Sequence, residues 1–238
     1  MRTHEDAIGY LAAPGEGAHP GVVVIPDVWG LSDHTRDIAR RLAGEGFAAL
    51  ALDIYRKTGF RELAGPEEAQ AWIRELPDPR VIETIQEGID HLAASEAAAG
   101  RRIGITGFCM GGQYVLLAAC SCRGLSAAAP FYGMLRYPED RDPARKPRSP
   151  LEALGDLTCP VLGFYGEEDA LIPLEDVREL EKKLEASPHE GSVVRYPGAG
   201  HAFMNDTRPA AYREEAARDT WSRLIPFLRR ELGGSKAG

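Results

Sequence analysis

Short, continuous apolar runs alternate along the chain with longer segments whose apolar residues recur every three or four positions. The short runs predict strands, at about residues 21–26, 47–52, 102–106, 127–132, 161–165 and 192–196. The periodic segments predict helices, at about residues 32–44, 66–100 with breaks at Pro77 and Pro79, 110–122, 174–186 and 209–232. Strands that alternate with helices favour an α/β fold, with a mostly parallel twisted sheet and helices on both faces.

The patterned segments follow one another without a repeat or a linker between separate regions. A chain of 238 residues can bury a full hydrophobic core, so we expect a single domain over residues 1–238. Residues 135–150 are rich in Pro, Arg and Asp and show no periodicity. We expect this segment to be a surface excursion between two strands that arches over the functional site.

Composition and charge narrow the possible partners. The apolar fraction of 44% is ordinary for a globular protein, and a formal net charge of −8 disfavours binding to nucleic acid. Residues 1–14 lack the apolar segment of a signal peptide, and no apolar stretch is long enough to cross a bilayer. Four cysteines do not make a disulfide framework in a chain of this length, and no histidine pair has the spacing of metal ligands. We therefore expect a cytoplasmic protein without membrane association, metal or other cofactor.

The first candidate for chemistry is a cysteine at a predicted strand–helix junction. Cys109 lies in the sequence Gly-Phe-Cys-Met-Gly-Gly, with Gly107 and Gly111 two positions away on either side. A nucleophile elbow needs small residues at these two positions, because the chain turns sharply from a strand into a helix there. The helix N-terminus then favours both a thiolate and an oxyanion. The alternative is a buried structural cysteine in a glycine-rich junction.

An acid and a histidine follow this cysteine in the order that a catalytic triad of this type requires. Asp169 comes shortly after the strand predicted at 161–165, and His201 after the strand at 192–196. The histidine would move a proton, and the carboxylate would orient its ring. Glu167 and Glu168 are rival acids, and a surface acidic loop and a capping histidine are the structural alternatives.

Three motifs together resemble the dienelactone hydrolase (carboxymethylenebutenolidase) family. They are the elbow at 107–112, Gly-His-Ala-Phe at 200–203 and Pro-Asp-Val-Trp-Gly at 26–30, and the similarity extends over nearly the whole chain. The resemblance implies an α/β-hydrolase fold and an esterase that opens esters or lactones through an acyl-enzyme thioester. It also implies that Asp27, where the family usually has glutamate, controls the protonation of the nucleophile. The alternative for Asp27 is a turn or helix-capping carboxylate.

The same resemblance implies an oxyanion hole and a substrate pocket. The backbone N–H groups of Val28 and Met110 would hold the oxyanion. The residues that would line the pocket are Trp29, Phe203 and Asn205, although Trp29 is nearly as well explained as a core residue. Two arginines bind the substrate carboxylate in characterised members of the family. Asn205 stands where one of them would be, and Arg208 is offset from it; the second has no aligned counterpart, and Arg61 and Arg74 are only candidates.

Two further residues open the helix predicted after residue 32. We expect His34 and Arg36 on its solvated face, with the pocket rim as the alternative.

Two functions remain open from the sequence. The first is hydrolysis of a small-molecule carboxylic ester or lactone, by a monomer or a homodimer; thiol chemistry would favour activated, enol-like leaving groups. The second is a non-catalytic homologue that binds a small ligand or a protein partner, because a fold does not by itself fix a function.

Overall fold

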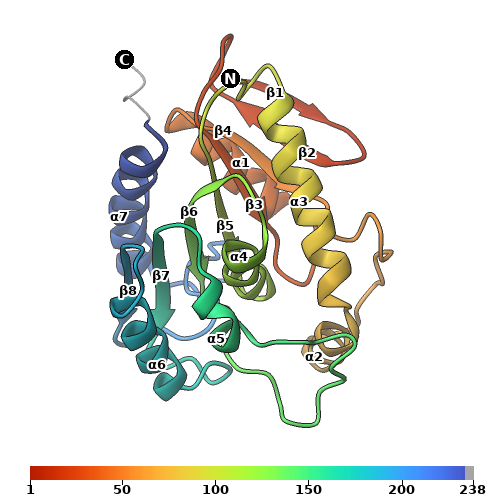
Figure 1. Cartoon of the computed structure of the whole chain (residues 1–238), viewed down its shortest axis with the longest axis vertical. Helices are drawn as coiled ribbons and strands as arrows, with labels where there is room; N and C mark the ends of the chain where they lie inside the picture. Colours follow the sequence, from red (N-terminus) through yellow and green to blue (C-terminus); the bar gives the residue numbers. More distant parts are fainter. Residues whose placement is uncertain (234–238) are drawn as a thin grey trace.

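Eight strands form one central sheet in the computed structural model, which describes residues 1–233 (Figure 1). In chain order they are β1 (Arg2–Glu5), β2 (Gly9–Ala13), β3 (Gly21–Ile25), β4 (Ala48–Leu52), β5 (Ile103–Phe108), β6 (Leu125–Phe131), β7 (Val161–Gly166) and β8 (Gly191–Tyr196). Their order across the sheet is β1-β2-β4-β3-β5-β6-β7-β8. Only the β1–β2 and β2–β4 pairs are antiparallel, so the predicted mostly parallel sheet is confirmed.

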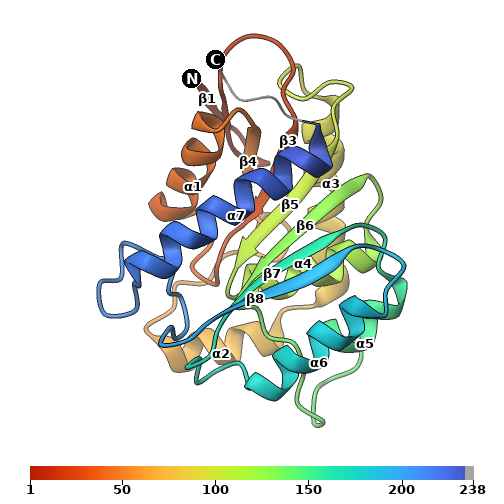
Figure 2. The same cartoon turned by 90° about the vertical axis from the view of Figure 1, so that its left-hand side faces the viewer.

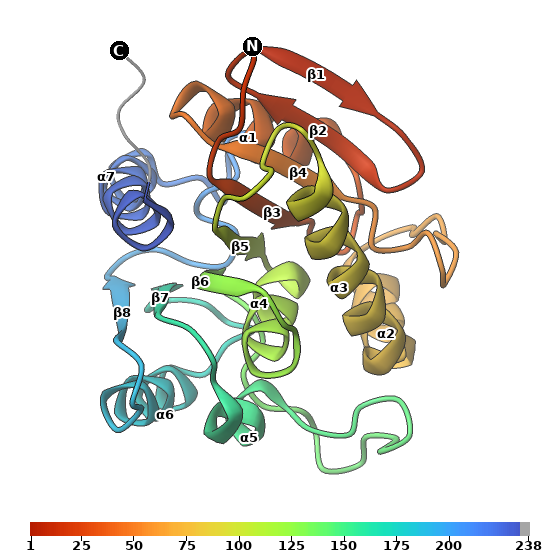
Figure 3. The same cartoon turned by 45° about the horizontal axis from the view of Figure 1, so that its top comes forward.

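Helices cover both faces of this sheet, as predicted. They are α1 (Asp33–Gly44), α2 (Pro66–Glu75), α3 (Asp78–Ala94), α4 (Met110–Ser121), α5 (Pro150–Ala153), α6 (Leu174–Glu185) and α7 (Glu214–Leu232), with a 3₁₀ turn at Leu154–Asp156. Figure 2 looks onto the face that carries α1 and α7, and Figure 3 shows α3, α4, α5 and α6 on the opposite face. The break between α2 and α3 lies at Pro77, because proline ends a helix that it cannot continue.

The central strand β3 shows why the sheet needs two covered faces. All five of its residues are buried, and the four side chains after Gly21 alternate between the two cores. Val22 and Val24 pack with α1 and α7, whereas Val23 and Ile25 pack with α3 and α4. Alternation of this kind is what a strand with helices on both sides requires.

The sequence pattern missed the antiparallel hairpin of β1 and β2 at one edge of the sheet. All four residues of β1 are exposed, so no apolar alternation marks it as a strand. The last helix is also shorter than predicted, because residues 209–211 form a turn, residues 212–213 are irregular and α7 begins at Glu214. No helix within residues 1–233 combines the length and the apolar character needed to cross a membrane.

The segment 135–150 is anchored beside the elbow helix. Lys146 and Asp78, both 3% exposed, form an ion pair of 2.6 Å, and Tyr137 donates a 2.8 Å hydrogen bond to the same carboxylate. None of residues 135–150 lines either cavity that contains Cys109, so the predicted arch over the site is wrong. The buried ion pair, which the sequence pattern does not reveal, holds the segment against α3 and α4.

Candidate active site

Five parallel strands place side chains at one edge of the sheet. The residues that follow β3, β5, β6, β7 and β8 there are, in order, Asp27, Cys109, Tyr132, Asp169 and His201. The C-terminal ends of parallel strands lie at one edge, which is where α/β sheets build their sites. All of these residues except Asp169 line one cavity, and Asp169 lies behind His201 as its hydrogen-bond partner.

Cys109 occupies a strained turn between β5 and α4. Its backbone has φ 55° and ψ −120°, in a region that residues with a side chain rarely adopt. The chain approaches other backbone atoms closely on both sides of this turn, which leaves no space for a Cβ atom. A Cβ atom on Gly107 would lie 2.7 Å from the Gly111 carbonyl oxygen, and one on Gly111 would lie 2.4 Å from the Ile25 carbonyl oxygen. The two glycines of the predicted elbow are therefore required by space.

His201 is paired with Asp169 and lies beside Cys109. Its Nδ1 lies 2.8 Å from Oδ2 of Asp169, whose side chain is 1% exposed. Burial disfavours the charged ring, but Asp169, through its hydrogen bond and charge, and the adjacent Cys109 outweigh burial and raise the pKa of His201 to about 10. Nε2 of His201 has no hydrogen-bond partner within residues 1–233. Of the rival acids, Glu167 pairs with Arg195 and Glu168 is exposed. Asp169 is thus the acid that orients the ring.

The turn at residues 27–30 is fixed by hydrogen bonds at both of its ends. Gly30 N–H donates to the Asp27 carbonyl, and Trp29 N–H donates to Oδ1 of Asp27, each at 3.0 Å. Burial raises the pKa of the Asp27 carboxyl, although the Trp29 N–H and the positive charge of Arg208 partly oppose this. Within residues 1–233, the Val28 N–H has no acceptor. The arrangement leaves that donor free for a ligand.

Tyr55 supports both residues of the predicted oxyanion hole from behind. Its hydroxyl donates a 2.8 Å hydrogen bond to the Val28 carbonyl and lies 3.7 Å from Sδ of Met110. Met110 is the first residue of α4, where backbone N–H groups have no partner inside the helix. The Val28 and Met110 N–H groups therefore belong to two segments that one buried tyrosine holds in place.

The cavity at Cys109 has two lobes, which share residues around Cys109 and His201. The first, of about 120 Å³, we call the Trp29 lobe; besides the shared residues it is lined by Asp27, Val28, Trp29, His34, Phe108, Asn205 and Arg208. The Arg208 guanidinium lies over the Trp29 ring, 5.6 Å from its centroid, and forms no ion pair with residues 1–233. The lobe therefore contains one cation that a negatively charged ligand group can approach.

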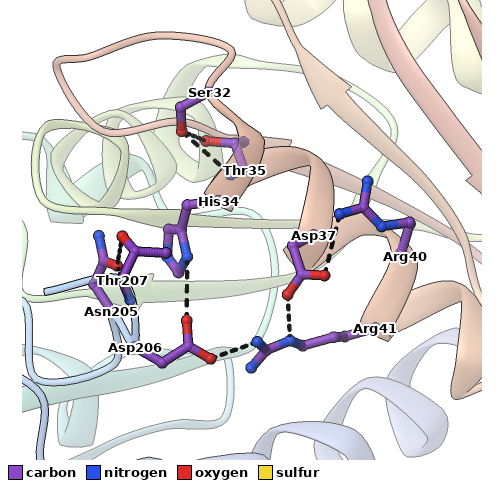
Figure 4. Close-up of polar contacts among 9 residues, drawn as sticks. All are labelled: Ser32, His34, Thr35, Asp37, Arg40, Arg41, Asn205, Asp206 and Thr207. Carbon is purple, nitrogen blue, oxygen red and sulfur yellow. Dashed lines mark hydrogen bonds and ion pairs between the residues drawn. The ribbon is translucent and has the colours of Figure 1, made fainter. Parts of the chain in front are cut away.

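His34 also lines the Trp29 lobe, so its predicted position on a solvated helix face is wrong. Its side chain is 10% exposed, and its Nδ1 lies 3.7 Å from Oδ1 of Asp206 (Figure 4). Asp206 also pairs with Arg41, which in turn holds Asp37 at 2.6 Å. Asp206 therefore links the loop after His201 to Arg41 of α1 and lies beside His34.

The second lobe, of about 250 Å³, we call the Gln113 lobe. Its lining includes Gln70, Ile73, Arg74, Met110, Gln113, Tyr132, Met134, Leu171 and Ile172. Tyr132 was not predicted as a site residue, although it follows a strand end as Asp27 does. Its backbone has φ 37°, and its ring packs edge-on against His201 with 5.2 Å between centroids. The strand-end rule that found the other residues would have found Tyr132 as well.

The three predicted pocket residues have different positions. Trp29 and Asn205 line the Trp29 lobe, whereas Phe203 is fully buried, packs against Tyr132 and Tyr196 and lines neither lobe. Ala202, at φ 61°, redirects the chain directly after His201, and Phe203 then points into the core. Within residues 1–233, no group of three or more His, Cys, Asp and Glu side chains is placed to hold a metal ion.

Known proteins resemble this chain over most of its length. A "Putative carboxymethylenebutenolidase" of Salmonella typhimurium is 36% identical over 98% of this chain and 85% of its own length. A "Probable 2-oxo-3-(5-oxofuran-2-ylidene)propanoate lactonase" of Bradyrhizobium is 34% identical over 98% of this chain and 92% of its own. The crystal structure of a "Putative Dienelactone Hydrolase" from Klebsiella pneumoniae, 34% identical, superposes with a TM-score of 0.85 over 93% of this chain and 92% of that one. This similarity confirms the α/β-hydrolase fold.

The family assignment follows from a match over almost the whole described chain. Residues 8–232 match the dienelactone hydrolase family, and this range contains the elbow, the turn at 27–30 and the loop around His201. The resemblance that the sequence motifs indicated is confirmed. The chain therefore belongs to the dienelactone hydrolase family.

Proposed function

We propose that this protein hydrolyses carboxylic esters or lactones, with Cys109 as nucleophile, His201 as acid and base and Asp169 as the residue that orients His201. One observation carries the proposal: Cys109, on its strained turn, shares a cavity with a histidine whose far nitrogen is held by a buried carboxylate at 2.8 Å. This is the arrangement that nucleophilic acyl transfer needs. The chain would act as one catalytic domain, because strands from both its halves share a single sheet.

The reaction follows from the positions of the proton and the charge. The Cys109 thiolate attacks the carbonyl carbon, and the Val28 and Met110 N–H groups stabilise the oxyanion that forms. The carbon–oxygen bond of the leaving group breaks, and the leaving oxygen takes a proton from His201. A water molecule then attacks the thioester while His201 accepts its proton, which releases the acid and regenerates Cys109. The raised pKa of His201 favours the protonated ring that the first half of this cycle uses.

Asp27 is proposed to control when Cys109 is charged. Its carboxyl lines the same lobe as Cys109, and burial raises its pKa. A carboxylate near a thiol disfavours the thiolate, and a substrate that changes the position or the charge of Asp27 would remove that effect. This role would make the nucleophile more reactive with substrate bound than without it.

The proposed substrates are small esters or enol lactones with a leaving group that departs easily. Thiolates attack carbonyls well, but they are themselves good leaving groups, so the tetrahedral adduct favours products only with an activated leaving group. The relatives are named as a lactonase and as carboxymethylenebutenolidases, which supports this class. Arg208 in the Trp29 lobe is placed to attract a carboxylate on such a substrate.

A panel of p-nitrophenyl esters, matched alkyl esters and enol lactones tests the proposal, with Cys109→Ala, Cys109→Ser and the buried-cysteine control Cys120→Ala. We expect wild type and Cys120→Ala to prefer activated esters and lactones, and Cys109→Ala to lose activity while keeping its fold by circular dichroism. Retention of most activity in Cys109→Ala would disprove the nucleophile. A wild-type protein that binds members of the panel and turns over none would instead be a non-catalytic binder.

A further inference from the structure

One buried acceptor in the Gln113 lobe has no partner inside the protein. Gln113 lies on α4, one turn after the elbow, and its N–H bonds to the Cys109 carbonyl at 3.3 Å. Its side chain is fully buried, yet Gln113 is one of the residues that line the lobe beside Cys109. Its Oε1 accepts no hydrogen bond from any of residues 1–233. Buried amide oxygens are rarely left in this condition, so a donor from outside the protein is expected.

A buried hydrogen-bond network determines which atom of the Gln113 side-chain amide has no partner. Asp78 accepts hydrogen bonds from the Tyr114 and Tyr137 hydroxyls, each at 2.8 Å, and lies 2.6 Å from Nζ of Lys146. The single hydroxyl proton of Tyr137 is therefore committed to Asp78. The Tyr137 oxygen can only accept on its other side, where Nε2 of Gln113 donates at 2.7 Å. Rotating the amide would set two acceptors against each other, so Oε1 is the atom left free.

The network is also shielded from solvent. Each of its five side chains, Asp78, Gln113, Tyr114, Tyr137 and Lys146, is at most 5% exposed. Burial raises the pKa of the Tyr137 hydroxyl well above its usual range, and the charge of Asp78 adds to this, so the hydroxyl keeps its proton. The Gln113 oxygen is thus a fixed acceptor, with no proton of its own to offer.

We propose that Gln113 is a specificity-determining residue, whose Oε1 accepts a hydrogen bond from a hydroxyl or N–H group on the part of the substrate that occupies the Gln113 lobe. This inference rests on the proposed ester and lactone hydrolysis and narrows its substrate class. The lining of that lobe combines the apolar side chains of Ile73, Met134 and Ile172 with the polar side chains of Gln70 and Arg74. The preferred substrate therefore carries a hydrogen-bond donor on the group that enters this lobe.

The test compares matched p-nitrophenyl esters that differ in one group. The acyl groups are butanoates with hydrogen, hydroxyl or methoxy at C2 or C3, and phenylacetates with the same groups at the meta or para position. The series thus places the hydrogen-bond donor at different positions within the lobe. For each pair, the ratio of kcat/KM values for the hydroxyl ester and its hydrogen analogue is measured on one enzyme sample. Because both rates come from the same sample, a partly unfolded variant does not change the ratio.

Three variants test whether Gln113 sets the preference for hydroxyl esters. In Gln113→Met the hydroxyl preference of wild type should fall about tenfold or more for at least one position, the size of effect of one hydrogen bond. In Tyr137→Phe the amide is free to turn, so discrimination between hydroxyl and methoxy should be lost. Gln86→Met is the control, since Gln86 lies on α3 and lines neither lobe, and it should keep the wild-type ratios.

Two results would overturn the inference while leaving the proposed hydrolysis intact. One is that Gln113→Met keeps every hydroxyl-to-hydrogen ratio within about twofold of wild type while hydrolysis still depends on Cys109. The other is that wild type prefers the methoxy ester to the hydroxyl ester at every position. Loss of all ester hydrolysis in wild type, or its survival in Cys109→Ala, would instead disprove the proposed function itself.

Discussion

Nδ1 of His201 lies 2.8 Å from Oδ2 of Asp169, and the Asp169 side chain is almost fully shielded from solvent. A carboxylate in this position fixes the ring so that the other nitrogen faces the cavity. It also stabilises the protonated ring, which is one reason that the pKa of His201 is raised to about 10. The pair therefore sets both the direction and the proton content of the histidine beside Cys109.

Asp169→Asn should lower the pKa of His201 by roughly one to three pH units, because it removes a negative charge in contact with the ring. The proposed mechanism uses the protonated ring, so wild-type activity should fall as the pH rises through about 10. In the variant this alkaline limb should move to lower pH, and kcat should fall roughly 10³- to 10⁴-fold. NMR titration of the His201 ring and pH–rate profiles measure both effects. The exposed neighbour gives the control Glu168→Gln, which should behave as wild type; an unchanged ring titration in Asp169→Asn would contradict the assignment.

Iodoacetamide should label Cys109 roughly 100-fold or more faster than the other cysteines at pH 8. Burial raises the pKa of Cys120, Cys122 and Cys159 to about 12, so almost none of their thiols is ionised at that pH. Cys109 is less buried and lies beside His201. Peptide mapping by mass spectrometry at successive times gives the four rates. Comparable rates for all four would argue against Cys109 as the accessible thiol of the site.

Tyr55→Phe should lower kcat about five- to tenfold with little change in KM. The substitution removes only the hydroxyl that bonds the Val28 carbonyl, which is worth about 1 kcal/mol, and so loosens one donor of the proposed oxyanion hole. A merely structural role would lower the melting temperature without separating kcat from KM. Tyr10→Phe, on the antiparallel strand β2, is the matched control. A rise in KM with unchanged kcat would point to ground-state binding instead.

Asp27→Asn should stabilise the folded protein at neutral pH. Burial raises the pKa of the Asp27 carboxyl, so the charged form costs folding free energy above that pKa, and the cost vanishes as the pH falls below the unfolded value of 3.8. Asparagine keeps an acceptor for the Trp29 N–H. Thermal unfolding should show a rise of about 2–4 °C at pH 7, the equivalent of about 1 kcal/mol, that shrinks toward pH 4. The control Asp33→Asn changes an exposed carboxylate and should show no such rise. Equal melting temperatures for wild type and Asp27→Asn at pH 7 would show that the charged Asp27 carboxylate does not destabilise the fold.

Local sequence patterns predicted most of the strands and helices of this protein and the positions of its candidate site residues. The elbow glycines, the order of Cys109, Asp169 and His201, and their places after strands follow from turn geometry and from apolar runs, which are readable over a few residues. The β1–β2 hairpin was missed because an exposed edge strand has no apolar face to mark it. His34 was assigned to solvent because helix periodicity does not show which loops lie above a helix end.

The sequence by itself determined the fold class, the family and the residues of the candidate site, because these depend on short motifs and on alternation along the chain. Only the tertiary structure decided that Phe203 lies in the core, that Tyr55 supports Val28 and that Oε1 of Gln113 is left without a partner. Such relationships join segments tens of residues apart. They depend on strand register and on which buried donor meets which acceptor, and no local pattern encodes either.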